Sequence, residues 1–512
     1  MSQIELPEGW CEATLQDVAD WGSGGTPSRK YAEYYDGDIP WVKTGDLGPK
    51  LLESCSESIT ELGVKNSSAK LFPKGSVALA MYGATIGRTS ILGMDATTNQ
   101  ACAVGNPVKG LTSSEFLYYF LSNEKDRFIA KGKGGAQPNI SQAVIKEHPF
   151  FLPPLAEQKV IADKLDILLA QVESIKARLE RIPEILKQFR QSVLAAAVSG
   201  KLTEEWRRNN PTEVVSNDEL LSLHKAFWLQ EKEREFQQKG KLPSNDKWRS
   251  MYKPPELIDI EKCWQTPETW AWVTIDSISF VTKLAGFEFT KSVKYIEDGE
   301  ISVIKAENVG KDGFRSTNFS KVAKEVVESL PRSELFGDEL LVVFVGAGVG
   351  QVGLVPSDQK YFLGPNVAVV RKTTGVYTSK FMELMLRSPL GQKNLLSFSK
   401  GAAQPSLSMG QIRQTTIPVP PLNEQELIIL KLENLFNKAN AIETQVLSAL
   451  DRVNNLTQSI LAKAFCGELT AEWREANTEL IIGENSAEAL LERIKAEREL
   501  AKPATKRGRG KS

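Results

Sequence analysis

The sequence predicts an α/β (α+β) protein in which two mixed-sheet domains are joined by two long antiparallel coiled-coil helices, with a pseudo-two-fold internal repeat. Two observations predict this fold. Most of the chain is written twice, and each copy contains a stretch of about 40 residues in which apolar side chains keep helical spacing. The expected divisions are a mixed-sheet domain, a long helix (central spacer), a short helix with linker, a second mixed-sheet domain, a second long helix (distal spacer), and a short helix with a basic tail. Their expected ranges are 1–152, 153–208, 209–265, 266–419, 420–475 and 476–512.

The repeat consists of segments that return in the second half of the chain in the same order. Residues 6–10, 39–48, 81–84, 134–141, 152–158 and 192–207 return at 266–270, 301–310, 344–347, 401–408, 419–425 and 459–474. Segments 49–70 and 311–334, in contrast, share almost nothing. Matching surfaces should perform one task twice, and divergent surfaces should perform two different tasks.

The two long helices are predicted by apolar positions that alternate steps of four and three without a miss. Such spacing is typical of one helix packed along another, and about 40 residues would make a rod of roughly 60 Å. An ordinary core helix in each domain is the alternative interpretation. The positions are Ile161, Leu165, Leu168, Val172, Ile175, Leu179, Ile182, Leu186, Phe189 and Val193, and in the second copy Ile428, Leu432, Leu435, Ala439, Ile442, Val446, Ala449, Val453, Leu456 and Ile460.

The composition sets limits on partners and chemistry. With 63 basic and 64 acidic residues, the net charge of −1 gives no bulk basic excess, so any DNA binding must come from local patches. Five scattered cysteines without a CxxC pair indicate a reducing compartment. The two histidines are too few for a histidine-rich metal site. The first residues lack a secretory pattern and no apolar stretch reaches the ~18 residues of a membrane span. We therefore expect a cytoplasmic protein that does not bind or span a membrane.

Short β-rich runs and helical patches alternate in the two mixed-sheet domains. Strands are predicted at 76–80 and 339–344, and helices near 114–123 and 379–387. Two further short helices are expected after the long ones, at about 217–238 and 486–500.

Several glycine-rich loops carry side chains suited to DNA. Glycine lets the backbone approach phosphates, lysine neutralises them, and glutamine can bond an adenine edge. A sharp glycine turn capped by polar residues is the alternative, and it applies equally to the Gln-Pro pairs that occur in both copies. The candidates are Arg29 and Lys30 in the first loop, Lys131, Lys133 and Gln137 in the second, and Lys400 and Gln404 in its twin.

Residues that read a base sequence should differ between the copies. Arg88 is matched by Gln351, and Tyr82 is matched by Val345. Lys43, which lies nearby, is a third expected base reader, and Lys305 of the second copy is a further DNA-binding candidate. We expect these positions to join the DNA-binding set.

No catalytic or metal-binding residue is predicted. Residues 348–353 match the GxGxxG pattern, but Pro356 follows closely and no helical period starts there, whereas a dinucleotide site needs a strand before and a helix after. A tight turn beside a strand is the expected structure. There is no GxxxxGK[ST] run, no [DN]PP[YF] run and no nucleophile set. The chain is predicted to bind and position other molecules, and an enzyme that uses 348–353 is a further hypothesis.

The chain resembles the specificity (S) subunit of type I restriction-modification enzymes over nearly its whole length. The resemblance rests on LPEGW at 6–10, KTGDL at 43–47, KGKGGAQPNIS at 131–141, LPPLAEQ at 152–158 and SGKLTEEWR at 199–207, each of which recurs in the family's order.

The resemblance implies two target-recognition domains, each reading one half of an asymmetric, split target in double-stranded DNA with an unread spacer. It implies that the helices set the spacer and bind two copies of a modification (methyltransferase) subunit, which uses S-adenosylmethionine to methylate adenine at N6. Restriction (motor-nuclease) subunits would join with ATP and Mg²⁺. This chain would then hold no cofactor of its own. A coiled-coil scaffold with two ligand-binding domains and no DNA is the alternative.

Overall fold

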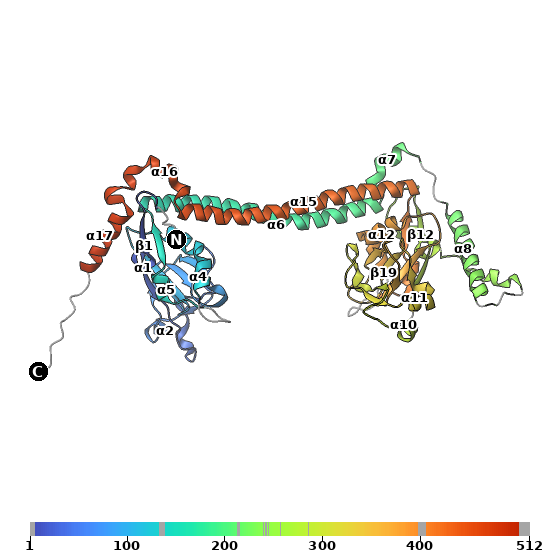
Figure 1. Cartoon of the computed structure of the whole chain (residues 1–512), viewed down its shortest axis with the longest axis horizontal. Coiled ribbons are helices and arrows are strands. Elements are labelled where there is room, and N and C mark those ends of the chain that lie inside the picture. The colour runs from blue at the N-terminus through green and yellow to red at the C-terminus, as the bar shows by residue number, and fades with distance from the viewer. Residues whose placement is uncertain are drawn as a thin grey trace. The chain divides into compact units, whose positions relative to one another are not determined.

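The computed structural model describes residues 6–132, 139–211, 216–238, 240, 243, 245–256, 258–284, 286–397 and 406–500. The chain divides into two units, which we call unit 1 (residues 1–180 and 447–512) and unit 2 (residues 181–446). Each unit contains one mixed-sheet domain together with parts of both long helices (Figure 1).

Unit 1 contains two sheets and a strand pair. The five-stranded sheet has the order β2-β10-β7-β8-β4, the four-stranded sheet has the order β5-β3-β9-β6, and β1 pairs with β11. Both larger sheets are mixed, because β4 lies parallel to β8 and β3 lies parallel to β9 while their other pairings are antiparallel. The strands are β1 Cys11–Thr14, β2 Ala19–Ser23, β3 Tyr35–Val42, β4 Leu51–Leu52, β5 Ser58–Ile59, β6 Leu71–Phe72, β7 Val77–Ala80, β8 Thr89–Leu92, β9 Ala96–Thr98, β10 Cys102–Pro107 and β11 Pro149–Leu152.

Short helices connect these strands and cover the sheets. They are α1 Leu15–Val18, α2 Glu61–Lys65, α3 Ser114–Asn123, α4 Lys125–Lys131 and α5 Gln142–Lys146, followed after the second long helix by α16 Ala471–Ala476 and α17 Ala487–Leu500. The Ser113 hydroxyl caps α3 by accepting a hydrogen bond from the amide of Phe116, as expected for serine before a helix. The predicted strand at 76–80 and helix at 114–123 are confirmed.

Unit 2 repeats the frame of unit 1 with a different interior. Its sheets have the orders β13-β22-β19-β20 and β17-β14-β21-β18, and β12 pairs with β23 and β15 with β16. The strands are β12 Ala271–Thr274, β13 Ser279–Lys283, β14 Ile301–Ile304, β15 Val309–Gly310, β16 Gly313–Phe314, β17 Ser320–Val322, β18 Glu334–Leu335, β19 Leu340–Val343, β20 Val352–Leu354, β21 Tyr361–Leu363, β22 Val367–Lys372 and β23 Thr416–Val419. The helices are α7 Glu204–Asn209, α8 Asn217–Gln238, α9 Ile275–Ile278, α10 Gly286–Ser292, α11 Lys324–Ser329, α12 Ser379–Arg387, α13 Pro389–Leu396 and α14 Met409–Gln414.

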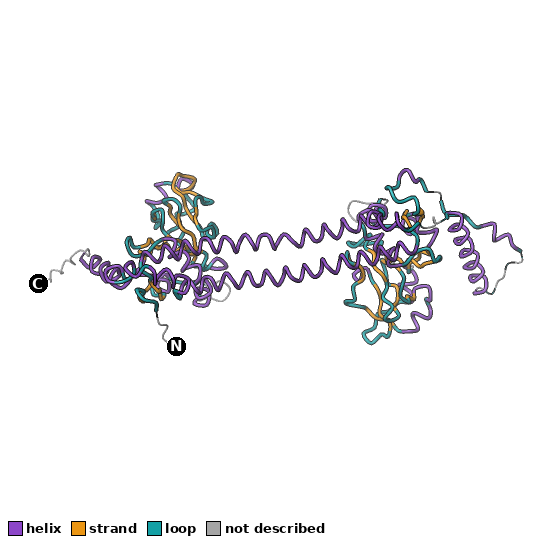
Figure 2. Tube along the Cα trace, turned by 90° about the horizontal axis from the view of Figure 1, so that it is seen from above, coloured by secondary structure: helices purple, strands orange, loops and turns teal. Residues whose placement is uncertain are grey.

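The two long helices, α6 (Leu155–Val198) and α15 (Leu422–Phe465), pack antiparallel. In unit 1 the start of α6 runs beside the end of α15, and in unit 2 the end of α6 runs beside the start of α15 (Figure 2). Each pair of helix ends contributes side chains to the apolar core of its unit. Arg190 of α6 also donates hydrogen bonds to Asn440 and Glu443 of α15, at 2.8 and 2.7 Å. The predicted pairing of the helices is confirmed.

Part of the predicted helix seam is wrong. Ile161, Leu165 and Leu186 are buried on α6, Leu168 and Leu179 are half-buried, and Ile428 and Leu432 are buried on α15 with Leu435 half-buried. Ile442 and Leu456, however, are 44% and 48% exposed, and their counterparts Ile175 and Phe189 are 46% and 39% exposed. The reason is geometric: a straight helix drifts by about 20° per heptad from a strict 3.5-residue repeat, and one partner helix covers only one side. Apolar side chains that keep a strict alternation of four and three residues therefore cannot all face the partner helix along the whole length.

A buried glutamate anchors each domain to the ends of the long helices. In unit 1 the Glu157 carboxylate, at the start of α6, accepts hydrogen bonds from Trp10 Nε1 at 2.8 Å and Thr470 Oγ1 at 2.6 Å, and it pairs with Arg474. In unit 2 Glu424 does the same with Trp270 at 2.9 Å, Thr203 at 2.7 Å, and Arg207. Each carboxylate is fully buried, so its charge requires these donors. The closing segment of each repeat thus completes the unit of the other repeat.

The neighbouring glutamine fixes the sheet domain at the same point. Gln158 donates to the carbonyl oxygens of Leu111 and Pro153 at 2.7 and 2.9 Å, and it accepts from the amide of Ser113 at 2.9 Å. Gln425 makes the matching three bonds in unit 2. The glycines that end the long helices, Gly200 and Gly467, are left-handed (φ 78° and 81°), as expected for residues just past a helix end.

Replacing Glu157 with alanine should destabilise unit 1 by about 3–5 kcal/mol, because the buried donors of Trp10 and Thr470 would lose their acceptor and the largely buried Arg474 would lose its counter-charge. Urea denaturation of the full chain measures this. Glu173, which is exposed on the same helix, provides the matched control, and Glu173→Ala should change stability by less than about 0.5 kcal/mol. Equal effects of the two substitutions would contradict the anchoring role.

Candidate nucleic-acid interface

The loops predicted to bind DNA meet at one end of the sheets in unit 1. Met81 lies at the centre: its amide donates to the carbonyl of Ala101 at 2.8 Å, and its carbonyl accepts from the amide of Ile140 at 3.0 Å. Asn99 donates to Val42 at 2.9 Å, just before Lys43. The loop before Arg29 is tied to the same place, because the amide of Gly25 donates to Thr98 at 2.9 Å.

Unit 2 builds the same junction of loops. The amide of Phe344 donates to Asn366 at 3.0 Å, and its carbonyl accepts from Leu407 at 2.8 Å. Gly364 donates to Ile304 at 2.8 Å, just before Lys305. The two units therefore present equivalent sets of loop ends, which we call loop cluster 1 (residues 24–30, 43–46, 81–88, 99–101 and 139–140) and loop cluster 2 (residues 305–308, 344–351, 364–366 and 406–407).

The predicted base-reading positions lie on matching hairpin tips in these clusters. The hairpin of β7 and β8 is closed by a bond from Ala80 to Arg88 at 2.8 Å, and that of β19 and β20 by one from Val343 to Gln351 at 2.9 Å. Tyr82 is 44% exposed, and its counterpart Val345 is 38% exposed. Arg88 is exposed and Gln351 is half-buried. The same backbone thus carries unlike side chains in the two units.

The glycine run at 348–353 belongs to the second of these tips. Residues 344–351 connect two antiparallel strands, β19 and β20, and no helix follows. A dinucleotide site needs a strand that leads into a helix. The predicted tight turn is confirmed, and the GxGxxG match carries no nucleotide-site geometry.

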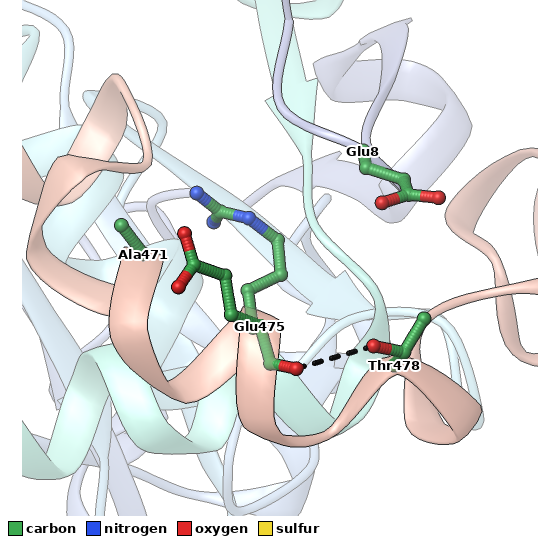
Figure 3. Close-up of a pocket in the computed structure, with 5 residues that line it drawn as sticks. Glu8, Ala471, Glu475 and Thr478 are labelled. Atoms are coloured by element: carbon green, nitrogen blue, oxygen red, sulfur yellow. Dashed lines mark hydrogen bonds between the residues drawn. The ribbon is translucent and has the colours of Figure 1, made fainter.

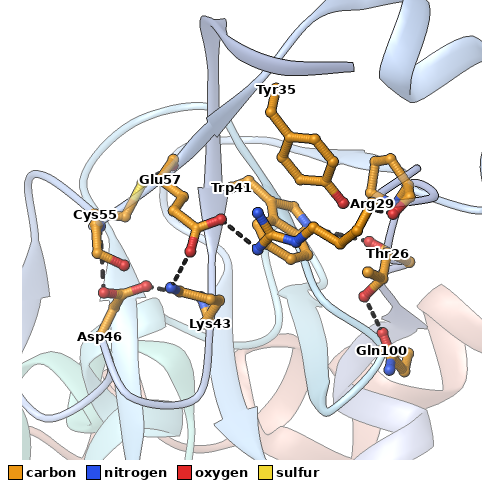
Figure 4. A network of polar contacts seen from close by, with 12 residues as sticks. Thr26, Arg29, Tyr35, Trp41, Lys43, Asp46, Cys55, Glu57 and Gln100 are labelled. Carbon is orange, nitrogen blue, oxygen red and sulfur yellow. Dashed lines mark hydrogen bonds and ion pairs between the residues drawn. The ribbon is translucent and has the colours of Figure 1, made fainter. Parts of the chain in front are cut away.

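Two predicted cations of loop cluster 1 are held by one carboxylate, Glu57 (Figure 4). Arg29 Nη2 and Lys43 Nζ each lie 2.5 Å from a different oxygen of Glu57. This pairing could not be predicted by comparing the two copies, because Glu57 lies in the divergent segment 49–70. Lys30, one residue on, is exposed and forms no ion pair with another described residue.

Lys43 and Lys305 begin equivalent turns. The backbone amide of Lys43 donates to Asp46 Oδ2 at 2.8 Å, and that of Lys305 donates to Asn308 Oδ1 at 2.9 Å. Lys305 Nζ pairs with Glu307 at 2.6 Å. A lysine that recurs on the same turn in both units suits the backbone of DNA, which is the same at every site, better than a particular base.

Lys131 is tied to a buried histidine. Its Nζ lies 3.1 Å from His148 Nδ1, and His148 Nε2 lies 2.8 Å from Glu124 Oε2. Because the ammonium group has only protons to give, Nδ1 accepts, and Nε2–H donates to Glu124. Burial raises the pKa of Glu124, but the hydrogen bond from His148 and the nearby Arg127 outweigh it and leave the pKa below its usual value. The predicted residues Lys133, Gln137, Lys400 and Gln404 lie outside the described residues.

A hollow of about 280 Å³ lies beside the Glu157 anchor (Figure 3). It is lined by Glu8, Ala471, Arg474, Glu475 and Thr478, and the Thr478 hydroxyl donates to the carbonyl of Glu475 at 3.3 Å. Arg474, which lines the hollow, forms an ion pair with Glu157. Within the described ranges, no cluster of three or more His, Cys, Asp or Glu side chains is arranged to hold a metal ion. No helix in those ranges has the length and apolar character that a membrane span requires.

Comparison with known proteins identifies the family. The family model described as the type I restriction modification DNA specificity domain matches residues 7–184 and 267–452. The EcoBI specificity subunit of Escherichia coli is 36% identical over 386 residues, which cover 75% of this chain and 72% of that protein. The EcoKI specificity subunit of Escherichia coli strain K12 is 32% identical, with 97% of each chain covered.

A solved structure shares the fold. The HsdS subunit from Thermoanaerobacter tengcongensis matches with a TM-score of 0.57 at 17% identity, covering 91% of this chain and 99% of that one. A chain from a structure of the type I R-M system matches with a TM-score of 0.60 at 15% identity, covering 91% of this chain and all of that one.

The repeated frame with unlike loop tips defines a class of protein in which two similar sheet domains carry different side chains at the same place. The chain belongs to the family of type I restriction-modification specificity subunits, as the family match and the relatives' identities show. It is a DNA sequence-specificity subunit that works in a type I complex with DNA, and it is non-catalytic. A scaffold that binds no DNA is not favoured.

The ion pairs of Glu57 should make the stability of unit 1 depend on pH. Hydrogen bonds from Lys43 and then Arg29 hold the pKa of Glu57 below its ordinary value of 4.5. A carboxyl whose folded pKa is lowered contributes stability above its unfolded pKa and loses it as the pH falls through the folded pKa. Glu57→Gln should therefore destabilise unit 1 near neutral pH by at most about 1 kcal/mol, because the pair is partly exposed, and this appears as a lower thermal midpoint. The difference from the unchanged protein should shrink as the pH falls below 4.5 and vanish once the pH is below the lowered folded pKa of Glu57.

Glu53→Gln is the control for this measurement. Glu53 is exposed on the same segment and forms no ion pair with any described residue, so this substitution should not alter the pH profile of the thermal midpoint. A Glu57→Gln difference that persists unchanged in acid would contradict the assigned network.

Proposed function

We propose that each unit binds one half of a split, asymmetric target in double-stranded DNA through its loop cluster, and that the spacer between the halves is not read. The observation that carries this proposal is the pair of matching hairpin tips with unlike side chains, Tyr82 and Arg88 against Val345 and Gln351. A frame that holds different side chains in the same place suits two different sequences.

Repeated cations would position the duplex, and divergent tips would read it. Lys43 and Lys305 recur on the same turn, which suits phosphate contacts that do not depend on sequence. The net charge of −1 gives the chain little general attraction to DNA. Much of the phosphate affinity would therefore come from partner subunits.

The exposed apolar side chains of the long helices support the docking of two identical partners. Unit 1 presents Ile175 and Leu456, and unit 2 presents the matching Ile442 and Phe189. We call the pair in each unit a helix ridge. The same surface that appears twice can bind two copies of one protein, and we assign it to two modification (methyltransferase) subunits. Restriction (motor-nuclease) subunits would complete the complex.

The cofactors of the proposed complex would be held by its partners. S-adenosylmethionine would serve adenine methylation by the modification subunits, and ATP with Mg²⁺ would serve the restriction subunits. The complex would act in the cytoplasm.

Exchanging residues 11–150 for the matching domain of another specificity subunit should change only one half of the recognised sequence. The measurement is selection of sequences by the full chain, with its modification partner, from duplexes with a randomised central segment. Binding should also weaken steeply with salt, because neutralised phosphates release counter-ions. A change in both halves would contradict the modular assignment, and the absence of salt-dependent duplex binding would contradict DNA recognition itself.

The two helix ridges give a second test. Ile175→Asp and Ile442→Asp should each remove one of two partner copies, since a charge in an apolar contact is costly. Native mass spectrometry of the complex counts the copies. Ser174→Asp adds the same charge to an exposed neighbouring position and should leave both copies bound. Two copies retained by both isoleucine variants would contradict docking at the helix ridges.

A further inference from the structure

The guanidinium of Arg29 is locked in one place by aromatic rings and a carboxylate (Figure 4). Its Cζ lies 4.1 Å from the centre of the Tyr35 ring and 5.3 Å from that of Trp41, and its Nη2 lies 2.5 Å from Glu57. Even so, 58% of the Arg29 side chain is exposed. It is a fixed group that faces solvent.

The platform beneath Arg29 is bonded back to the loop that carries it. The Tyr35 hydroxyl donates to the carbonyl of Pro27 at 2.5 Å, and Trp41 Nε1 donates to the carbonyl of Gly25 at 3.0 Å. The two rings meet edge to face, with centroids 5.9 Å apart. The loop that carries Arg29 is therefore bonded to the same two rings that lie against the guanidinium.

Glu57 is itself held in place from the other side. Its second oxygen accepts from Lys43 Nζ at 2.5 Å, and Lys43 begins the turn fixed by Asp46. Glu57 accepts a hydrogen bond from one of the five N–H groups of Arg29, and no other hydrogen-bond partner of this side chain is found among the described residues. The second N–H of Nη2 and an N–H of a neighbouring guanidinium nitrogen thus remain as a fork for a ligand.

We propose that Arg29 reads a guanine in the half-site bound by unit 1, with Glu57 as its positioning residue. This inference rests on the proposed function and names a specificity-determining residue for it. Guanine presents two acceptors, O6 and N7, in the major groove, and arginine donates to both at once. Because the side chain is already ordered, binding costs little further conformational entropy. A side chain that contacts phosphate needs no such platform. The exposed Lys30, next to Arg29, suits a phosphate contact.

Unit 2 builds a different structure at this point of the frame. The segment between β13 and β14 forms helix α10, and Phe289 packs against Tyr295 with ring centroids 6.1 Å apart. The position that carries the fixed arginine thus differs between the units, as expected for a residue that distinguishes their two sequences.

The test compares sequence selection by the full chain carrying single substitutions, again with duplexes that have a randomised central segment. Arg29→Lys keeps the charge but removes the fork. It should lower the preference for guanine at one position by about 10- to 100-fold, while every other position of both halves is kept. Glu57→Gln should weaken the preference at that same position without altering the others.

Lys30→Gln is the matched control. It should weaken binding to all sequences alike and lower the salt slope by about one, without changing the selected motif. Thermal midpoints confirm that each variant folds. An unchanged motif with Arg29→Lys, or equal loss at all positions, would overturn the inference while leaving the proposed function standing. If the unaltered chain selects no sequence, the proposed function itself fails.

Discussion

Each recognition unit depends on one buried carboxylate. Glu157 and Glu424 carry charge in fully buried positions, and each is satisfied by a tryptophan, a threonine and an arginine. The tryptophan and glutamate come from one repeat, and the threonine and arginine come from the closing segment of the other. A buried charge without partners is costly, so the sheet domain and the helix ends are held in one geometry.

The sequence predicted the repeat, the long helices and several short elements, because these follow from local periodicity and turn residues. The apolar spacing did not reveal that Ile442 and Leu456 leave the seam, since exposure depends on how many neighbours a helix has. The anchor was missed although its residues recur in both copies, because a buried polar contact between distant segments has no local pattern. Glu57 was missed for a different reason: its segment has no counterpart in the second half, so no comparison within the chain marks it.

The candidate site divides into a constant part and a variable part. The constant part comprises the backbone bonds around Met81 and Phe344 and the turns that begin at Lys43 and Lys305. The variable part comprises the hairpin tips and the structure around Arg29. The internal repeat predicted the backbone frame that the two units share. Which side chains contact one another on that frame could be learned only from the three-dimensional structure. This division is suited to a protein whose scaffold stays the same while its target sequence changes.

The most direct test is a genome-wide map of N6-methyladenine in a host that carries this chain with its modification partner. We expect methylation at one asymmetric, split motif with an unread spacer, and we expect this methylation to disappear when the gene for this chain is deleted. A continuous or palindromic motif, or methylation that persists without the chain, would contradict it.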